Sequence, residues 1–243
     1  MNKKIKKALI VLIALVVLSV LGLWIYVQIR TYPAEAEYLA LIMADDRITV
    51  TEEQNHFIIT PVALNPDAIP IIYYPGGLVA PEAYLYKMGT VAANLNTRVY
   101  IIKAPFNAAI FNIKAAGPII EHYELGQAWV GGHSLGGIAA CRYVSGDPDN
   151  AYGLYLFGSY CDQNISGFTG PVVSVIGLQD YIINRNNYLE AKSQLPLTAN
   201  VIEIEGLNHS GFGNYGLQKD DGESSLNNEQ VIEIISSVFD VNN

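Results

Sequence analysis

The chain has 243 residues, of which 51% are hydrophobic, and a formal net charge of −9. Residues 1–30 hold five of the 14 basic residues and none of the 23 acidic ones, so residues 31–243 keep nine basic residues and a net charge of −14. An acidic surface of this kind repels nucleic acid and anionic lipid, and we expect neither as a partner.

The N-terminal segment has the features of a membrane anchor. Four lysines within residues 3–7 precede an uncharged, mostly aliphatic run from Ala8 to Ile29. A run of this length can cross a bilayer as a helix, and Trp24 and Tyr26 lie near its outer end, where aromatic rings favour the interface. The excess of lysines predicts an N-terminus inside the cell and the rest of the chain outside.

A cleaved secretory signal is the alternative interpretation of this segment. Ala34-Glu35-Ala36 has the A-x-A form that signal peptidases cut. The apolar run is longer than the hydrophobic region of most signals, so we favour a single-pass membrane protein over one secreted after cleavage near Ala36. Both interpretations place the rest of the chain outside the cytoplasm.

Strands and helices alternate along the remaining chain. Residues 31–47 form a connector with a short helix, and residues 48–51 and 57–62 form a hairpin around a polar turn. Further strands are expected at 69–74, 99–103, 128–132, 152–157, 172–176 and 201–204, and helices at 82–95, 108–120, 187–194 and 229–241, the second of them kinked at Gly117-Pro118. This pattern predicts an α/β fold with a mostly parallel, twisted sheet, an antiparallel hairpin at its start and helices on both faces.

Residues 132–136, Gly-His-Ser-Leu-Gly, lie between an expected strand and an expected helix. A strand, a sharp turn with serine at its apex and a helix form the setting of a nucleophilic serine. The outer glycines leave room in the strained turn, and the helix start directs free N–H groups and a positive dipole end at the reacting centre. Ser134 is therefore the candidate nucleophile.

A serine hydroxyl needs a base, and on such a fold the chain order is serine, acid, histidine. His209 follows Ser134 in sequence and lies in a loop just after strand 201–204, which makes it the candidate base. Asp180 follows strand 172–176 through a short turn and is the candidate acid. Asp162, after the preceding strand, is the alternative, and we favour Asp180.

An oxyanion hole needs two preorganised N–H groups. The first is expected from Leu135, directly after the nucleophile. The second is expected from Gly77 or Leu78, in the turn at the carboxyl end of strand 69–74, where glycine lets the backbone approach a substrate oxygen closely.

Four segments together resemble the alpha/beta-hydrolase superfamily, above all its compact, cap-less dienelactone-hydrolase-like and small esterase branch. They are residues 73–78, 131–137, 177–180 and 206–213. The resemblance covers about residues 48–241 and implies Ser134 as nucleophile, Asp180 as acid and His209 as base, with backbone donors near Gly77 and Leu135. The sequence departs from the family pattern at three positions. Pro75 stands where many members have histidine, and Gly131 replaces the aliphatic residue usual before the motif in lipases. Ser134 stands where dienelactone hydrolases have cysteine. The expected organisation is an anchor over 1–30, a connector over 31–47 and a hydrolase domain over 48–243.

Members of the superfamily often carry a cap inserted after the strand that follows the nucleophile helix. Here only 14 residues, Gly158 to Pro171, connect that strand to the next, which is too short for a helical cap. The site should be open. Tyr160, Cys161, Phe212, Tyr215 and Leu78 are the residues expected at its rim, where they would favour an apolar acyl or aryl group.

The leading hypothesis is therefore an exported, membrane-anchored serine hydrolase that cleaves a small carboxylic ester through an acyl-enzyme. Amide or peptide hydrolysis, or acyl transfer on cell-envelope substrates, would use the same residues and is the alternative. A non-catalytic scaffold is less favoured because nucleophile, acid, base and oxyanion turn occur in order. No cofactor or metal is expected. Cys141 and Cys161 could pair outside the cell, but we favour two separate buried thiols.

Overall fold

The computed structural model describes residues 3–239 and contains two compact units, one ending at Thr31 and one beginning at Tyr32. The first unit contains helix α1, Lys3–Arg30. This helix is long and apolar enough to cross a membrane, a criterion that a signal sequence near the N-terminus also meets. The apolar helix predicted at the N-terminus is thus present.

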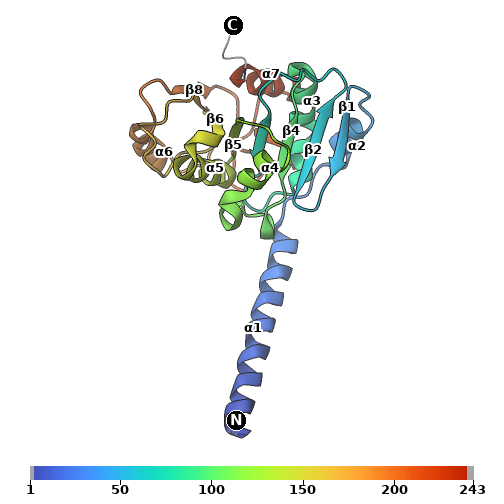
Figure 1. The fold of residues 1–243 in the computed structure, drawn as a ribbon, viewed down its shortest axis with the longest axis vertical. Helices are drawn as coiled ribbons and strands as arrows, with labels where there is room; N and C mark the ends of the chain where they lie inside the picture. The colour runs from blue at the N-terminus through green and yellow to red at the C-terminus, as the bar shows by residue number, and fades with distance from the viewer. Residues whose placement is uncertain (1–2, 240–243) are drawn as a thin grey trace. The chain divides into compact units, whose positions relative to one another are not determined.

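The second unit is built on one sheet, and Figure 1 labels most of its strands. Among the described residues its strands are β1 (Ile48–Glu52), β2 (His56–Pro61), β3 (Ile71–Tyr74), β4 (Val99–Ile102), β5 (Ala128–His133), β6 (Ala151–Phe157), β7 (Val172–Gly177) and β8 (Asn200–Ile204). They lie in the order β1-β2-β4-β3-β5-β6-β7-β8. The β1–β2 hairpin is antiparallel and also pairs antiparallel with β4, whereas β3 to β8 run parallel, which confirms the predicted mixed sheet. The carboxyl ends of β3 to β8 therefore meet at one edge.

Helices cover both faces of this sheet (Figure 1). They are α2 (Ala36–Met43), α3 (Leu85–Leu95), α4 (Ala116–His122), α5 (Leu135–Gly146), α6 (Arg185–Ala191) and α7 (Asn228–Val238). Residues of α2, α3 and α7 join one core and residues of α4 and α5 join the other. Successive residues of β3 alternate between the two, since Ile71 and Tyr73 belong to the first core and Ile72 and Tyr74 to the second. Burial on both faces explains why β3 and β4 read as uninterrupted apolar runs.

Three predicted helices are partly 3₁₀ in the structure: residues 82–84 lie in the 3₁₀ helix Pro81–Tyr84, residues 192–194 form the 3₁₀ helix Lys192–Gln194, and the segment 108–120 differs most. The segment predicted as one kinked helix is a 3₁₀ helix, Ala109–Ala115, followed by α4. The break falls at Asn112, whose backbone is not helical, whereas Gly117 and Pro118 lie in the first turn of α4. A proline there costs no intrahelical hydrogen bond, because the first N–H groups of a helix lack such a partner anyway. The last predicted helix is α7, and residues 240 and 241 of that prediction lie outside the described residues.

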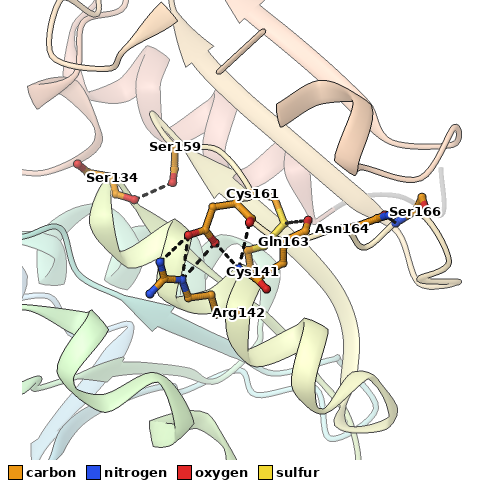
Figure 2. Close-up of a disulfide and its surroundings, with 9 residues drawn as sticks. Ser134, Cys141, Arg142, Ser159, Cys161, Gln163, Asn164 and Ser166 are labelled. Atoms are coloured by element: carbon orange, nitrogen blue, oxygen red, sulfur yellow. Dashed lines mark hydrogen bonds and ion pairs between the residues drawn. A yellow bond between two sulfur atoms is a disulfide. The ribbon is translucent and has the colours of Figure 1, made fainter. Parts of the chain in front are cut away.

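Cys141 and Cys161 form a disulfide, which corrects the expectation of two separate thiols. Cys141 lies within α5 and Cys161 four residues beyond β6, with their Cα atoms 5.4 Å apart (Figure 2). The Arg142–Asp162 ion pair joins the same two segments beside it. The pairing was considered from the sequence but not favoured, and the proximity of the two cysteines arises because α5 packs against β6.

Replacing both cysteines, in Cys141→Ala/Cys161→Ala, should lower the free energy of unfolding by about 3 kcal/mol. The disulfide closes a loop of about 20 residues and so restricts the unfolded chain. Urea unfolding of the wild type, oxidised and reduced, and of the double variant measures this difference. Equal stability of the oxidised and reduced wild type would show that the bond contributes nothing.

Lys87, on α3, is a buried amine whose side chain is only 2% exposed and whose hydrogen bonds go to neutral oxygens. Its Nζ donates to the oxygen of Gly213 at 2.9 Å, to Oδ1 of Asn214 at 3.0 Å and to Oδ1 of Asn228. It thereby ties the loop that follows His209 to the start of α7. Burial lowers the pKa of Lys87 to about 7.

The free energy of unfolding of the wild type, relative to that of Lys87→Met, should therefore increase as the pH rises from about 7 to about 10. The folded chain releases the Lys87 proton near pH 7, whereas the unfolded chain keeps it up to about pH 10.4. The unfolded state binds more protons in this window, so stability rises by at most about 1.4 kcal/mol per pH unit. Urea unfolding of both proteins across this range tests the effect, and a difference that is independent of pH would contradict it.

Candidate active site

Ser134 lies at the sharp turn between β5 and α5, with a backbone φ of 53° and ψ of −124°. Two hydrogen bonds to the end of β6 hold this strained turn. The N–H of Ser134 donates to the oxygen of Phe157 at 2.9 Å, and the oxygen of Ser134 accepts from Oγ of Ser159 at 2.6 Å (Figure 2). A positive φ at a non-glycine residue is strained, and such strain is concentrated at functional sites.

The glycines on either side of Ser134 are required by close packing. A Cβ atom at Gly132 or at Gly136 would overlap the backbone oxygen of Tyr74, at the end of β3. The turn at Ser134, called the nucleophile elbow below, therefore packs directly against β3. The turn after β3 carries the expected oxyanion donors.

Asp180 and His209 lie against each other, as expected from the sequence. Oδ2 of Asp180 and Nδ1 of His209 are 2.8 Å apart, and both side chains are almost fully buried. Oδ1 of Asp180 accepts from the N–H groups of Ile182 and Ile183, at 3.0 and 2.9 Å. With both oxygens engaged, the carboxylate has one orientation and fixes the imidazole ring.

The alternative acid, Asp162, lies elsewhere. Its carboxylate forms an ion pair with Arg142 of α5, with an Nη2–Oδ2 distance of 2.5 Å. The residue is exposed and braces the loop that also carries the disulfide. Asp180 is thus the carboxylate that the fold brings to His209.

The imidazole of His209 lies beside the elbow. Its ring centroid is 4.4 Å from that of His133, the residue before Ser134. Within residues 3–239 no hydrogen bond joins Ser134 Oγ to His209. In substrate-free enzymes this contact is often long and shortens when substrate binds.

His133 is fully buried and supports the turn that carries the candidate oxyanion donors. Its Nδ1 is 2.9 Å from Oη of Tyr84, which in turn accepts from the N–H of Gly76 at 3.0 Å. Burial, together with the neighbouring His209, lowers the pKa of His133 well below its usual range. A neutral His133 adds no positive charge beside the candidate base. No role for His133 was predicted from the sequence.

Two of the three candidate oxyanion donors, Gly77 and Leu135, have an N–H group without a hydrogen-bond partner among the described residues. The N–H of Leu78 donates to the oxygen of Asn107 at 2.7 Å, so this donor is already engaged and the expectation that it could bind a substrate oxygen is corrected. Gly77 remains free of such a bond among the described backbone contacts, and a Cβ atom added to it would stand 2.9 Å from Cδ2 of Leu135. Leu135 opens α5, where the first N–H groups have no intrahelical partner.

Asp221, which lies 12 residues after His209, braces the candidate base. Oδ1 accepts from the N–H of His209 at 3.2 Å, and Oδ2 accepts from the N–H and the hydroxyl of Ser210. Oδ1 also accepts from the N–H of Tyr181, next to Asp180, at 3.4 Å. One carboxylate therefore connects the loop of the acid with the loop of the base.

Three of the expected rim residues are not at a rim. Cys161 is buried in the disulfide, and Phe212 and Tyr215 are 1% and 5% exposed. Phe212 stacks on Phe157 at 5.3 Å, which places it in the core behind the candidate base. Tyr160 is partly exposed and can still contact substrate. The loop after His209 turns inward, so aromatic residues in it serve the core.

Gly158, directly after β6, was not identified from the sequence. Its φ is +48°, and a Cβ atom on it would lie 3.1 Å from Nδ1 of His209 and 3.2 Å from Oδ2 of Asp180. Both atoms belong to the acid–base pair. A side chain at this position would push directly on their hydrogen bond.

Gly158→Ala should lower kcat by about 10- to 100-fold, because small displacements of catalytic groups cost this much. Gly126→Ala is the matched control, since Gly126 has a φ of +67° but no atom within 4 Å of the position that a Cβ would take. Both variants carry a similar backbone strain, and only the first disturbs the pair. Steady-state kinetics with thermal unfolding separates the effects, and equal activities would refute the steric argument.

The comparisons with known proteins agree with this architecture. The sequence profile described as "Alpha/beta hydrolase family" matches residues 70–233, which is more than half of the chain. The chain therefore belongs to the alpha/beta hydrolase family. No curated protein matches the sequence.

Similar solved structures include several esterases. Carboxylesterase CesB of Bacillus subtilis has a TM-score of 0.60 and 12% identity, covering 85% of this chain and 96% of its own. Naproxen esterase of Bacillus subtilis has a TM-score of 0.59 and 11% identity, covering 85% and 95%. Dienelactone hydrolase of Anabaena variabilis has a TM-score of 0.58 and 12% identity, covering 80% and 98%. At these identities the likeness establishes the fold and confirms the resemblance drawn from the sequence motifs.

Proposed function

We propose that the protein is a serine hydrolase of carboxylic esters that acts through an acyl-enzyme. The observation that carries this proposal is the buried Asp180–His209 pair, with a 2.8 Å hydrogen bond, at the strand edge where Ser134 occupies a strained elbow. The named esterases among the structural neighbours are consistent with this activity.

The reaction follows from the roles of these groups. His209 takes the proton of the Ser134 hydroxyl as its oxygen attacks the ester carbonyl carbon. The N–H groups of Gly77 and Leu135 stabilise the negative oxygen of the tetrahedral intermediate. His209 then gives the proton to the leaving alcohol, and an acyl-serine remains. Water, deprotonated by His209, attacks this ester, releases the carboxylic acid and restores Ser134.

A serine-directed probe and two substrates test the proposal. Purified wild type should react with a fluorophosphonate probe and should hydrolyse a short-chain aryl ester faster than the matching aryl amide. Faster cleavage of the amide would favour the amidase alternative. Failure to react with the probe or to hydrolyse either substrate would favour a non-catalytic scaffold.

We further propose that the hydrolase unit is exported and remains attached to the membrane by α1. The disulfide supports export, because such bonds persist in oxidising compartments. Tyr32 supports a retained anchor, because its N–H donates to the oxygen of Leu78 at 2.8 Å and its oxygen accepts from the N–H of Ala80 at 2.9 Å. Cleavage near Ala36 would remove this bridge and cut the chain at the start of α2.

Mass analysis of the natural N-terminus and protease accessibility in intact cells test this location. A retained N-terminus, with residues beyond Tyr32 accessible from outside, is the expected result. A chain beginning after Ala36 would show that the segment is a signal peptide.

A further inference from the structure

We infer that the hydrolase acts at the membrane surface, on amphiphilic esters whose acyl chain lies in the outer leaflet. This inference rests on the proposed function and specifies the substrate class of the same site. It follows from where the chain enters the hydrolase unit, from the side chains exposed at that edge of the sheet and from the openness of the site.

The chain enters the hydrolase unit beside the candidate oxyanion turn. Tyr32 pairs with Val79 in a parallel bridge, and its N–H donates to the oxygen of Leu78, one residue from Gly77. Its hydroxyl accepts from the N–H of Lys219, in the loop that follows His209. The first residue of the unit therefore contacts two of the loops that build the site.

The length of the chain alone then limits the distance between the site and the bilayer. Arg30, which ends the apolar helix, is two residues before Tyr32, and two residues span at most about 7 Å. With the helix in a bilayer, Gly77 lies within roughly 20 Å of the membrane interface for every orientation of the unit. A soluble substrate would require no such tether, whereas an ester held at the interface would meet the site directly.

Exposed apolar side chains occur at the same edge of the sheet. We call Phe106, Phe111, Tyr181 and Leu217 the apolar rim; their exposures lie between 37% and 69%. Phe106 and Phe111 contact each other after β4, in the segment whose Asn107 oxygen accepts from Leu78. Tyr181 follows Asp180, and Leu217 lies in the loop after His209. Phenylalanine, tyrosine and leucine exposed together favour contact with an interface.

The site itself is open enough for a substrate that stays partly in the bilayer. Residues 158–171, all of them described, contain no helix or strand, and Ser134 and Leu135 are partly exposed. The net charge of −14 beyond residue 30 disfavours anionic headgroups. The substrate class is therefore a neutral or zwitterionic acyl ester.

The test compares two esters of one fluorogenic alcohol. Full-length protein is reconstituted into phosphatidylcholine vesicles that contain 4-methylumbelliferyl oleate, and 4-methylumbelliferyl butyrate is supplied in the water. A rigid helical spacer of about 25 residues, built of Glu-Ala-Ala-Ala-Lys repeats, is inserted between Arg30 and Thr31 and adds roughly 35 Å. A flexible Gly-Ser spacer of equal length is the control, because it lets the unit return to the surface.

The rigid spacer should lower the ratio of oleate to butyrate hydrolysis by about tenfold, because it removes the high local concentration of substrate, and the flexible spacer should lower it less. Phe111→Ser should lower the same ratio, whereas Leu197→Ser should not, since exposed Leu197 precedes β8 at the opposite edge of the sheet. An unchanged ratio with the rigid spacer would overturn this inference alone. If the wild type hydrolyses neither ester, the proposed function fails and the inference falls with it.

Discussion

Replacing Ser134 with alanine should lower kcat for a short-chain aryl ester by about 10⁶-fold, the loss known for serine-protease nucleophiles. Labelling by a fluorophosphonate probe should disappear as well. The variant loses only the side-chain hydroxyl. The two hydrogen bonds that hold the turn remain, because they use the backbone N–H and C=O of residue 134. The fold should therefore survive, which thermal unfolding measures.

Ser159→Ala is the matched control for this experiment. Its hydroxyl is adjacent to the elbow and donates to the oxygen of Ser134, yet it has no assigned role in the reaction. This variant should still react with the probe. If Ser134→Ala retains the label and Ser159→Ala loses it, the nucleophile has been assigned to the wrong serine.

The second large effect is expected for the acid. Asp180→Asn should lower kcat by about 10⁴-fold, and Asp162→Asn should change it little. Oδ1 of residue 180 accepts from two backbone N–H groups, so the asparagine oxygen should keep that place and turn its NH₂ group toward Nδ1 of His209. That group donates where the carboxylate accepts, and the imidazole would take the wrong tautomer.

Kinetics on both variants across a range of pH completes this test. The residual activity of Asp180→Asn should rise with pH, as hydroxide replaces the disabled base. Asp162→Asn breaks a partly exposed ion pair with Arg142, and such pairs contribute about 0 to 1 kcal/mol to stability. If kcat falls strongly in Asp162→Asn and stays nearly unchanged in Asp180→Asn, the catalytic acid lies after β6 and not after β7.

Much of the fold was predictable because it depends on local patterns. Strand β3 is a continuous apolar run between two prolines, β7 is apolar apart from Ser174 and ends at Gly177, and the hairpin of β1 and β2 surrounds a polar turn. The 3₁₀ stretch before α4 was missed. Periodicity does not distinguish a 3₁₀ helix from an α-helix, and the backbone break at Asn112 has no signal in the residue types.

The order of Ser134, Asp180 and His209 along the chain was sufficient to nominate them. The residues that brace them were not predictable from this order. Asp221 reaches His209 from 12 residues downstream, and Gly158 matters because the loop of Asp180 and the loop of His209 both approach it. Phe212 and Tyr215 were expected at the rim of an open site, but the loop that carries them packs their rings inward against Phe157 and Tyr84.

The link between Cys141 and Cys161 gives this protein a stability that depends on where it folds. A chain that folds in a reducing compartment keeps two free thiols, and only one that reaches an oxidising compartment gains the covalent link between α5 and the segment after β6. The added stability concerns α5, the helix that begins directly after the candidate nucleophile Ser134. Material purified from a reducing cytosol and from an oxidising compartment would thus be two covalent forms of one sequence, and thiol titration of each preparation should accompany any comparison of their activity.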